Sequence, residues 1–460
     1  MGTVPVVAIV GRPNVGKSTL FNAFTRSRDA LVVDLPGVTR DRIYGRCEIA
    51  GRTVILIDTG GLSDATGRLE SLARRQTEAA IEEADLVLFV SDGRSGPLAE
   101  DHEIVSRLRQ QGKSIVHVVN KTDGLDEQAA LAEASELGLS PVVAIAASHR
   151  RGIDSLAAET APLLPALADD TQDSAEGLKL AFIGRPNVGK STLLNRFVGE
   201  ERAVASEVPG TTRDPVHARV ERDGEVFQLV DTAGIRRRRA THEAVEAFSV
   251  IKALKAMESA EVVVLLLDAT EGVTDQDARL AGHVIEAGRA LVIVLNKWDG
   301  LDDASRRRCL IEVGERMNFA AFAPVVTLSA LHGSGLGELI DAVCHVHRSA
   351  SMELPTPQLT RALRHAVESH PPPSSRRFTP KLRYAHSGGT FPTRIIIHGN
   401  RTGHVDASYR RYLINSFRRQ FELAGVPLKL IFKDTENPYA GRRQRSPAGG
   451  RRGRTVRRKR

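Results

Sequence analysis

The sequence GRPNVGKS occurs twice in this chain of 460 residues, at positions 11–18 and 184–191. Both copies match the phosphate-binding pattern G-x-x-x-x-G-K-[ST], in which a glycine-rich loop and the start of a helix present backbone N–H groups to a phosphate. Each copy follows an apolar run, at residues 4–10 and 178–183, and precedes a helix-like stretch. This order of strand, loop and helix predicts two phosphate-binding sites in one chain.

Three further motifs follow each loop in the same order. PGVTRD, DTGG and NKTD occur in the first copy, and PGTTRD, DTAG and NKWD occur in the second. Gly184 follows Gly11 by 173 residues and Asn296 follows Asn120 by 176, so a whole domain is duplicated. We expect the following organisation: a first domain at 1–167, an acidic linker at 168–177, a second domain at 178–348, a small α+β domain at 349–437 and a basic disordered tail at 438–460.

Short apolar runs alternate with amphipathic segments in each copy. Such runs are typical of strands buried on both faces, and their alternation with helices indicates a doubly wound, mostly parallel α/β sheet. The motifs lie at the C-terminal ends of these strands, where such sheets bind ligands. The expected strands of the first copy are residues 4–10, 53–58, 86–90, 115–120 and 142–146. Those of the second are residues 178–183, 227–231, 262–268, 291–296 and 325–328.

The NKxD motif of each copy indicates guanine as the base. The carboxylates of Asp123 and Asp299 can accept from both the N1–H and the 2-amino group of guanine, and adenine has no such pair of donors. A site built on such bonds rejects an analogue that lacks them by roughly 10⁴–10⁵. The alternative is that each aspartate is a solvated loop residue. Because the motifs recur in order in both copies, we expect two GTP-binding and GTP-hydrolysing domains rather than an ATPase or a kinase.

The loops also contain the groups that hold a magnesium-bound phosphate chain. Lys17 supplies an ammonium group to the β- and γ-phosphates and Ser18 offers its hydroxyl to Mg²⁺, with Lys190 and Ser191 as counterparts. The aspartates of the DTxG motifs, Asp58 and Asp231, end a strand at the position that holds Mg²⁺ through water.

Thr39 and Thr212 lie in the segments before the DTxG motifs. A threonine there can place its hydroxyl on Mg²⁺ and its N–H on the γ-phosphate only while that phosphate is present. This predicts a segment that orders with GTP and relaxes with GDP. A threonine that only caps a loop is the alternative.

Neither copy has a glutamine to orient the attacking water, because Leu62 and Ile235 follow the DTxG motifs. Asn14 and Asn187, inside the phosphate loops, suggest a different activator. An asparagine carbonyl oxygen near the β- and γ-phosphates could help to hold K⁺, which would act where an arginine acts elsewhere. The alternative is that asparagine only shapes the loop.

The candidate residues fall into three groups. The catalytic candidates are Lys17, Thr39, Asn14, Lys190, Thr212 and Asn187. The Mg²⁺ candidates are Ser18, Thr39, Asp58, Ser191, Thr212 and Asp231. The GTP/GDP-binding candidates of the first copy are Gly11, Arg12, Pro13, Asn14, Val15, Gly16, Lys17, Ser18, Thr19, Asp58, Thr59, Gly60, Gly61, Leu62, Asn120, Lys121, Thr122, Asp123 and Ala147. Those of the second copy are Gly184, Arg185, Pro186, Asn187, Val188, Gly189, Lys190, Ser191, Thr192, Asp231, Thr232, Ala233, Gly234, Ile235, Asn296, Lys297, Trp298, Asp299, Ser329 and Ala330.

Two domains in tandem with these motifs resemble the Der family, also called EngA, within the Era-like GTPases of bacterial ribosome assembly. The resemblance covers essentially the whole chain. It implies a KH-like C-terminal domain, nucleotide-dependent association with the large (50S) ribosomal subunit and K⁺-stimulated hydrolysis. The first copy departs from the usual Ser-Ala motif, which is present at Ser329 and Ala330, because it has Ala146 and Ala147. We expect a somewhat altered GTP affinity there, since one neutral hydrogen bond contributes about 0.5–1.5 kcal/mol.

Charge is unevenly distributed along the chain. The formal net charge is +8, but residues 350–460 contain 24 Lys/Arg and 6 Asp/Glu, so the preceding residues are acidic overall. The tail at 441–460 has ten Lys/Arg and no acidic residue, which favours disorder and contact with rRNA phosphates, with a solubilising tail as the alternative. A second basic run, at residues 236–239, could contact RNA or the third domain, or could be a solvated loop.

The third domain is expected to contain strands at 381–385, 394–398 and 428–432 and a helix at 406–424. It lacks the GxxG loop that grips the backbone of RNA in ordinary KH domains. Its KH-like character is therefore implied by the resemblance alone, and an RNA contact through a GxxG clamp is not supported.

Other features bound the location and the function. The three cysteines show neither disulfide nor metal spacing, and we expect a monomeric, cytoplasmic protein that makes no membrane contact. The expected function is a GTPase of ribosome biogenesis acting on the large subunit. A GTP-dependent RNA-docking scaffold, in which hydrolysis is incidental, is the alternative. A tRNA-modifying GTPase would need a further domain, and no segment is large enough for one.

Overall fold

The computed structural model describes residues 4–25, 44–59, 78, 81–165, 177–199, 218–222, 224–230, 249–373 and 379–434. These residues divide into two compact units, each of which is described by itself. The first unit contains both P-loop domains, together with residues 390–393 and 422–428. The second unit contains most of the third domain.

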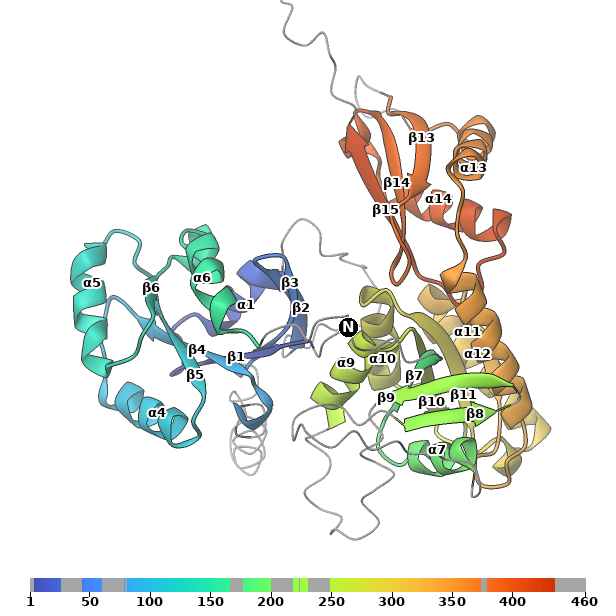
Figure 1. The fold of residues 1–460 in the computed structure, drawn as a ribbon, viewed down its shortest axis with the longest axis horizontal. Helices are drawn as coiled ribbons and strands as arrows, with labels where there is room; N and C mark the ends of the chain where they lie inside the picture. The colour runs from blue at the N-terminus through green and yellow to red at the C-terminus, as the bar shows by residue number, and fades with distance from the viewer. Residues whose placement is uncertain are drawn as a thin grey trace, which may run out of the picture. The chain divides into compact units, whose positions relative to one another are not determined.

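The first P-loop domain is a six-stranded sheet in the order β2-β3-β1-β4-β5-β6, with helices beside it (Figure 1). All neighbouring strands pair in parallel except β2, which is antiparallel to β3. The strands are β1 (Val6–Val10), β2 (Tyr44–Ile49), β3 (Arg52–Asp58), β4 (Leu86–Asp92), β5 (Ser114–Asn120) and β6 (Val142–Ala144). The helices are α1 (Lys17–Thr25), α4 (Ala99–Gln110), α5 (Glu127–Ala134) and α6 (Ile153–Thr160).

The second P-loop domain repeats this topology, with the strand order β8-β9-β7-β10-β11-β12 and β8 antiparallel to β9. Its strands are β7 (Leu178–Gly184), β8 (Ala218–Arg222), β9 (Glu225–Val230), β10 (Val262–Asp268), β11 (Ala290–Asn296) and β12 (Val325–Thr327). Its helices are α7 (Lys190–Val198), α9 (Ser249–Ser259), α10 (Asp275–Glu286), α11 (Asp303–Arg316) and α12 (Leu336–Ser351).

The central strands form the core of each domain. Every residue of β1, β10 and β11 is buried, as expected for apolar runs covered on both faces. The predicted doubly wound fold is therefore confirmed. The edge strands β2 and β8 were not predicted, because only one face of each is buried: Cys47 and Ile49 are buried in β2, whereas Glu48 between them is exposed.

The third domain has a three-stranded sheet in the order β13-β14-β15, with strands β13 (Lys381–Ser387), β14 (Thr393–Asn400) and β15 (Leu428–Asp434). Helices α13 (Thr356–Ser369) and α14 (Ala407–Gln420) accompany it. The predicted strands and the second helix are confirmed. That helix begins where Asp406 accepts a hydrogen bond from the N–H of Tyr409 (2.7 Å), and it buries Tyr409, Leu413 and Phe417. Helix α13 was not predicted.

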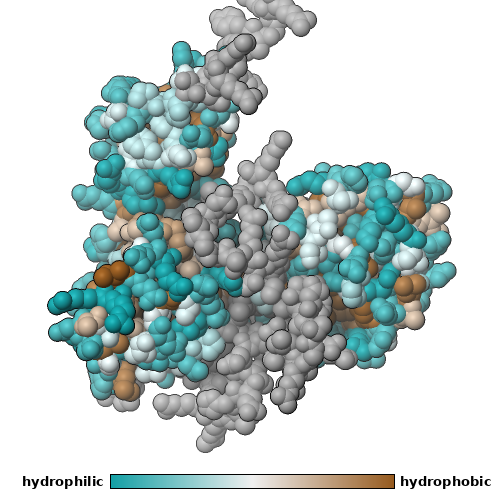
Figure 2. All heavy atoms as spheres, turned by 180° about the vertical axis from the view of Figure 1, so that it is seen from behind, coloured by the Kyte–Doolittle hydropathy of each residue, from teal (hydrophilic) through white to brown (hydrophobic). Residues whose placement is uncertain are grey.

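Hydrophilic residues cover much of the face drawn in Figure 2, with apolar residues scattered among them. Of the helices that the structure describes, none has the length and apolar character that a membrane span requires. Cys47, Cys309 and Cys344 all carry free thiols. The predicted linker apart from its last residue, the basic run at 236–239 and the C-terminal tail lie outside the described residues.

Candidate functional site

The two P-loops have the same local structure. The Nζ of Lys17 donates to the carbonyl oxygens of Gly11 (2.8 Å) and Arg12 (2.7 Å). The Nζ of Lys190 donates to the equivalent carbonyls, at 2.8 Å for Gly184. Helices α1 and α7 begin at these lysines, so their N-terminal N–H groups and the ammonium groups lie at the same end of each loop.

A glycine before each lysine permits a close approach by the NKxD asparagine. Gly16 and Gly189 have φ values of 98° and 99°, in the left-handed region that favours glycine. A Cβ at Gly16 would lie 2.3 Å from Nδ2 of Asn120, and a Cβ at Gly189 would lie 2.2 Å from Nδ2 of Asn296. The glycine pattern of the loop is therefore also required for contact with a motif more than 100 residues away.

The NKxD asparagine connects three motifs in each domain. Asn120 donates from Nδ2 to the carbonyl oxygen of Val15 (2.9 Å) and accepts at Oδ1 from the N–H of Ala147 (3.0 Å). Asn296 makes the same two bonds with Val188 (2.7 Å) and Ala330 (2.9 Å). Both asparagines are buried, so these bonds hold the P-loop, the NKxD turn and the Ser-Ala loop in one arrangement.

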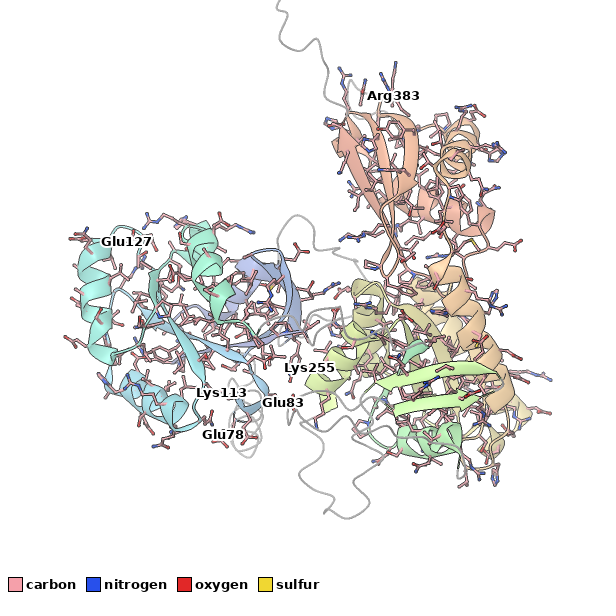
Figure 3. All side chains as sticks on the ribbon, viewed as in Figure 1. Glu78, Glu83, Lys113, Glu127, Lys255 and Arg383 are labelled. Carbon is pink, nitrogen blue, oxygen red and sulfur yellow. The ribbon has the colours of Figure 1, made fainter. Side chains whose placement is uncertain are left out.

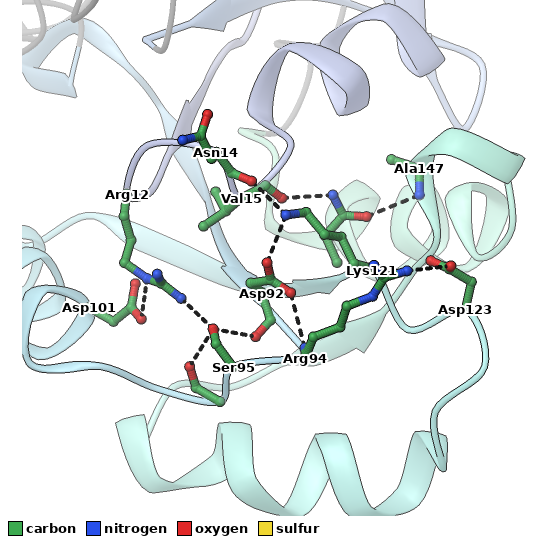
Figure 4. A network of polar contacts seen from close by, with 12 residues as sticks. Arg12, Asn14, Val15, Asp92, Arg94, Ser95, Asp101, Lys121, Asp123 and Ala147 are labelled. Atoms are coloured by element: carbon green, nitrogen blue, oxygen red, sulfur yellow. Dashed lines mark hydrogen bonds and ion pairs between the residues drawn. The ribbon is translucent and has the colours of Figure 1, made fainter.

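The NKxD lysine adds a charged connection, shown in Figure 4. Lys121 Nζ donates to the carbonyl oxygen of Asn14 and to Oδ2 of Asp92, both at 2.7 Å. In the second domain Lys297 pairs in the same way with Asp268. A hydrogen bond from Lys297 contributes to holding the pKa of Asp268 below its usual value, against the opposing effect of burial.

The DTxG aspartate of the first domain lies at the C-terminal end of β3. Asp58 is fully buried and is in register with Ile9 of β1, and the hydroxyl of Thr59 donates to the carbonyl oxygen of Ile9 (2.7 Å). This places Asp58 beside the strand that leads into the P-loop. Its counterpart Asp231 lies outside the described residues.

The remaining NKxD positions also correspond. The hydroxyl of Thr122 donates to the carbonyl oxygen of Ile145 (2.9 Å), and the N–H of Trp298 donates to the carbonyl oxygen of Leu328 (3.2 Å). Each bond joins the NKxD turn to the segment that precedes the Ser-Ala loop.

Several predicted residues lie outside the described part of the chain, and their roles stay predictions. They are Thr39, Gly60, Gly61, Leu62, Thr212, Asp231, Thr232, Ala233, Gly234 and Ile235. The described P-loop candidates run from the end of β1 or β7 into the first turn of α1 or α7.

The two domains differ at the carboxylate predicted to read guanine. Asp123 pairs with Nη2 of Arg94 at 2.6 Å. Asp299 lies 3.3 Å from Nε2 of His332. A hydrogen bond from the Ser329 hydroxyl is the largest influence that lowers the pKa of Asp299, and Ala146 has no hydroxyl to offer at the equivalent position.

Sequence reasoning missed two buried carboxylates that anchor the P-loop arginines. Asp101, at the start of α4, accepts from Nε of Arg12 at 2.8 Å. Asp277, at the start of α10, accepts from Nε of Arg185 at 3.0 Å and 3.1 Å. Both carboxylates are fully buried. Each loop is thereby fixed to a neighbouring helix.

A signal for these residues was present in the duplication. Asp277 follows Asp101, and Asp268 follows Asp92, by the same 176 residues that separate the two NKxD motifs. Aligning the copies at this offset would have identified all four aspartates, none of which belongs to a named motif.

The donor sets fit a magnesium-bound nucleotide. Each described P-loop offers an ammonium group, a helix N-terminus and a serine hydroxyl, and the first domain adds the carboxylate of Asp58. Burial, followed by the neighbouring Arg185 guanidinium, lowers the pKa of Lys190 to about 8. An anion bound beside Lys190 would favour the charged ammonium form.

The fold and these sites define a protein with two P-loop GTPase domains in tandem. The family model described as "50S ribosome-binding GTPase" matches residues 6–121 and 179–297. The model described as "KH-domain-like of EngA bacterial GTPase enzymes, C-terminal" matches residues 353–433. The chain belongs to the Der (EngA) family of GTPases and binds and hydrolyses GTP.

Individual relatives support this assignment. GTPase Der of Thioalkalivibrio sulfidiphilus is 52% identical over 445 residues, which cover 96% of this chain and 95% of that protein. GTPase Der of Xanthomonas campestris is 50% identical over 443 residues, with the same coverage of both chains. Among solved structures, the FeoB G-domain of Methanococcus jannaschii is 27% identical over 35% of this chain and 97% of its own, but the TM-score of 0.27 supports no structural conclusion.

Proposed function

We propose that this GTPase is a ribosome biogenesis factor that acts on the large subunit, with two Mg²⁺-dependent sites whose nucleotide state switches the arrangement of its domains. The observation that carries the proposal is the matching connection of P-loop, NKxD turn and Ser-Ala loop through Asn120 and Asn296. Two sites with the same connection between base and phosphate motifs on one chain suit a factor that responds to nucleotide at both domains.

In each proposed site, different groups of the chain bind the phosphates and the metal. Lys17 and Lys190 neutralise charge on the β- and γ-phosphates, and the N-terminal N–H groups of α1 and α7 bind phosphate oxygens. Ser18 and Asp58 would hold Mg²⁺ in the first domain, with Ser191 and Asp231 in the second. The metal would supply charge neutralisation between the phosphates.

The switch is assigned to Thr39 and Thr212 from their sequence positions. Each threonine would bind Mg²⁺ and the γ-phosphate with GTP and would release them with GDP. Such order-dependent contacts are one way in which a GTPase changes its binding surfaces.

Potassium is the proposed activator in place of the missing glutamine. Asn14 and Asn187 both have a φ of 63°, in the left-handed region that asparagine tolerates better than most residues. In Figure 4 the side chain of Asn14 points away from the Lys121–Asp92 pair, while its carbonyl oxygen accepts from Lys121. Lys121 therefore contacts the backbone of Asn14 and not its amide oxygen.

The potassium proposal is tested by GTP turnover in K⁺ and in Na⁺ at equal ionic strength. Glycine at Asn14 or Asn187 accepts the left-handed backbone and removes the amide oxygen. We expect wild-type turnover to be faster in K⁺, and each glycine variant to bring the ratio of the two rates closer to one. Equal wild-type rates in the two salts would refute the proposal.

The third domain is proposed to contact rRNA. The rings of Tyr384 and His398 stack at 4.5 Å and 5°, His386 lies 5.2 Å from His398, and Tyr384 is 41% exposed. Arg383 is exposed and extends outward from β13 in Figure 3. Aromatic rings beside basic side chains are a common surface for unpaired bases and phosphates.

The ribosome proposal is tested by sedimentation of the full chain with purified large and small subunits. We expect comigration with the large subunit that differs between a non-hydrolysable GTP analogue and GDP. Deletion of residues 442–460 should weaken this binding and reduce its salt dependence, because fewer phosphates are neutralised. Equal association with both subunits in every nucleotide state would contradict the proposal.

A further inference from the structure

The turn that follows β4 in the first domain differs from its duplicate at one position near the predicted guanine carboxylate. Arg94 and Thr270 occupy equivalent places, two residues after Asp92 and Asp268 respectively. The N–H of Arg94 donates to Oδ1 of Asp92 at 3.0 Å, and the N–H of Thr270 donates to Oδ1 of Asp268 at 3.0 Å. The backbone hydrogen bond at this position is therefore the same, and the side chain differs.

The two side chains reach different carboxylates. The hydroxyl of Thr270 turns back onto Asp268 at 2.6 Å. The longer side chain of Arg94 extends to the NKxD turn, where Nη2 lies 2.6 Å from Oδ2 of Asp123 (Figure 4). Arg94 thus brings a charged donor to the carboxylate that is expected to read guanine, and Thr270 does not.

The opposite difference occurs on the Ser-Ala loop. Ser329 and Ala146 have equivalent backbone positions, because each forms an isolated antiparallel bridge with the residue five positions later in the chain. The Ser329 hydroxyl is close enough to Asp299 to lower the pKa of that carboxyl, whereas Ala146 is buried and has no donor in its side chain. Each NKxD aspartate therefore has neighbouring side chains that can donate to it, from the turn after β4 in the first domain and from Ser329 and His332 of the Ser-Ala loop in the second.

We propose that Arg94 is a positioning residue for guanine recognition in the first domain, where its guanidinium takes the place of the Ser329 and His332 side chains that neighbour Asp299 in the second. This inference rests on the proposed guanine site at Asp123. A carboxylate held at one oxygen has fewer orientations to lose when it accepts the N1–H and the 2-amino group of the base.

The expected effect is modest because the pair is accessible to water. The side chains of Arg94 and Asp123 are 56% and 32% exposed. Exposed ion pairs change equilibria by about twofold to fivefold. We therefore expect Arg94→Thr, which installs the residue of the second domain, to weaken GDP binding at the first site by about threefold to fivefold.

The experiment uses the full chain with Asp299→Asn, so that the first domain is the guanine site under test. GDP and IDP are titrated calorimetrically, because IDP lacks the 2-amino group and makes one bond fewer to Asp123. We expect Arg94→Thr to weaken GDP binding more than IDP binding. Adding Ala146→Ser to Arg94→Thr should restore the wild-type preference for GDP over IDP, since the serine returns a donor to the carboxylate.

A matched control and two further outcomes make the test decisive. Arg107→Thr removes an exposed arginine that pairs with Glu103 on α4, and it should leave both affinities unchanged. Equal losses for GDP and IDP, or no rescue by Ala146→Ser, would overturn the role of Arg94. Asp123→Asn tests the site itself: if it leaves GDP binding intact, the proposed guanine site is wrong, whatever Arg94 does.

Discussion

The two P-loop domains share their phosphate end and differ at their base end. Lys17 and Lys190 make matching bonds to their loops, and both NKxD asparagines make matching bonds to theirs. In contrast, Asp123 is paired with Arg94, whereas Asp299 lies near His332 and near Ser329, whose hydroxyl lowers the pKa of that carboxyl. The phosphate loop is constrained by its own backbone, but the base pocket is completed by side chains from separate loops, which can diverge after duplication.

The connection between P-loop and helix also differs in detail. Asp277 accepts from Arg185 through both oxygens and from the hydroxyl of Thr274 (2.7 Å). Asp101 accepts from Arg12 and from the N–H of Leu98 (3.0 Å). The Arg185 guanidinium also pairs with Glu271 at 2.9 Å, so two described carboxylates hold the P-loop arginine of the second domain, whereas Asp101 holds that of the first.

The largest expected effect comes from changing the carboxylate that is predicted to bind guanine in one domain at a time. Asp123→Asn and Asp299→Asn each replace an acceptor with an amide that cannot accept from both guanine donors. We expect guanine-nucleotide affinity to fall by about 10⁴ at the altered domain only, with a gain of affinity for xanthine nucleotides. Titration of GDP and XDP on the full chain would measure both changes. Loss of both guanine sites in either single variant would contradict two independent pockets.

The next effect concerns the buried anchors. Asp101→Asn leaves the mostly buried Arg12 without its charged partner, which should destabilise the first domain by about 3 kcal/mol. After Asp277→Asn the Arg185 guanidinium keeps Glu271 at 2.9 Å, so we expect a smaller loss in the second domain. Calorimetric unfolding would show one transition lowered. Glu100→Gln and Asp275→Asn, at exposed positions on the same helices, are the controls. Transitions that match those of the controls would show that the anchors contribute little.

Sequence predicted the parallel strands well because burial on both faces leaves continuous apolar runs, as in β10. It missed helix α13, although Leu359, Ala362, Leu363 and Ala366 are buried at helical spacing, because that stretch follows the expected end of the second domain.

The sequence predicted those candidate site residues that belong to contiguous motifs. Asp101 was not predicted, because its partner Arg12 is 89 residues away and the contact exists only after the sheet has formed. The same holds for Arg94, whose pairing with Asp123 depends on two loops at the ends of neighbouring strands. Long-range pairs of this kind require either the structure or a comparison of the two copies.

A smaller effect is the pH dependence of the second site. Burial lowers the pKa of Lys190 from 10.5 to about 8, so the free site loses this proton as the pH rises through about 8. A bound diphosphate favours the ammonium form, so binding above that pH takes up a proton. We expect GDP affinity to fall about tenfold per pH unit between pH 8 and 10. Titrations of the Asp123→Asn chain in buffers of different ionisation enthalpy would detect the uptake. In Lys190→Arg the group stays charged, so the slope should vanish, and an unchanged slope would assign it to another residue.

The smallest expected effect comes from a substitution that makes the second base pocket more like the first. Ser329→Ala removes the hydroxyl that lowers the pKa of Asp299, and it reproduces Ala146 of the first domain. Because Asp299 is exposed to water and His332 remains nearby, we expect GDP affinity at the second site to fall by only about threefold. Adding Thr270→Arg should recover that loss if an arginine on the turn after β10 can reach Asp299 as Arg94 reaches Asp123. Recovery would show that an arginine and a serine can each position the NKxD aspartate. A loss that Thr270→Arg does not reverse would show that Ser329 also orders its own loop, where its hydroxyl accepts from the N–H of His332.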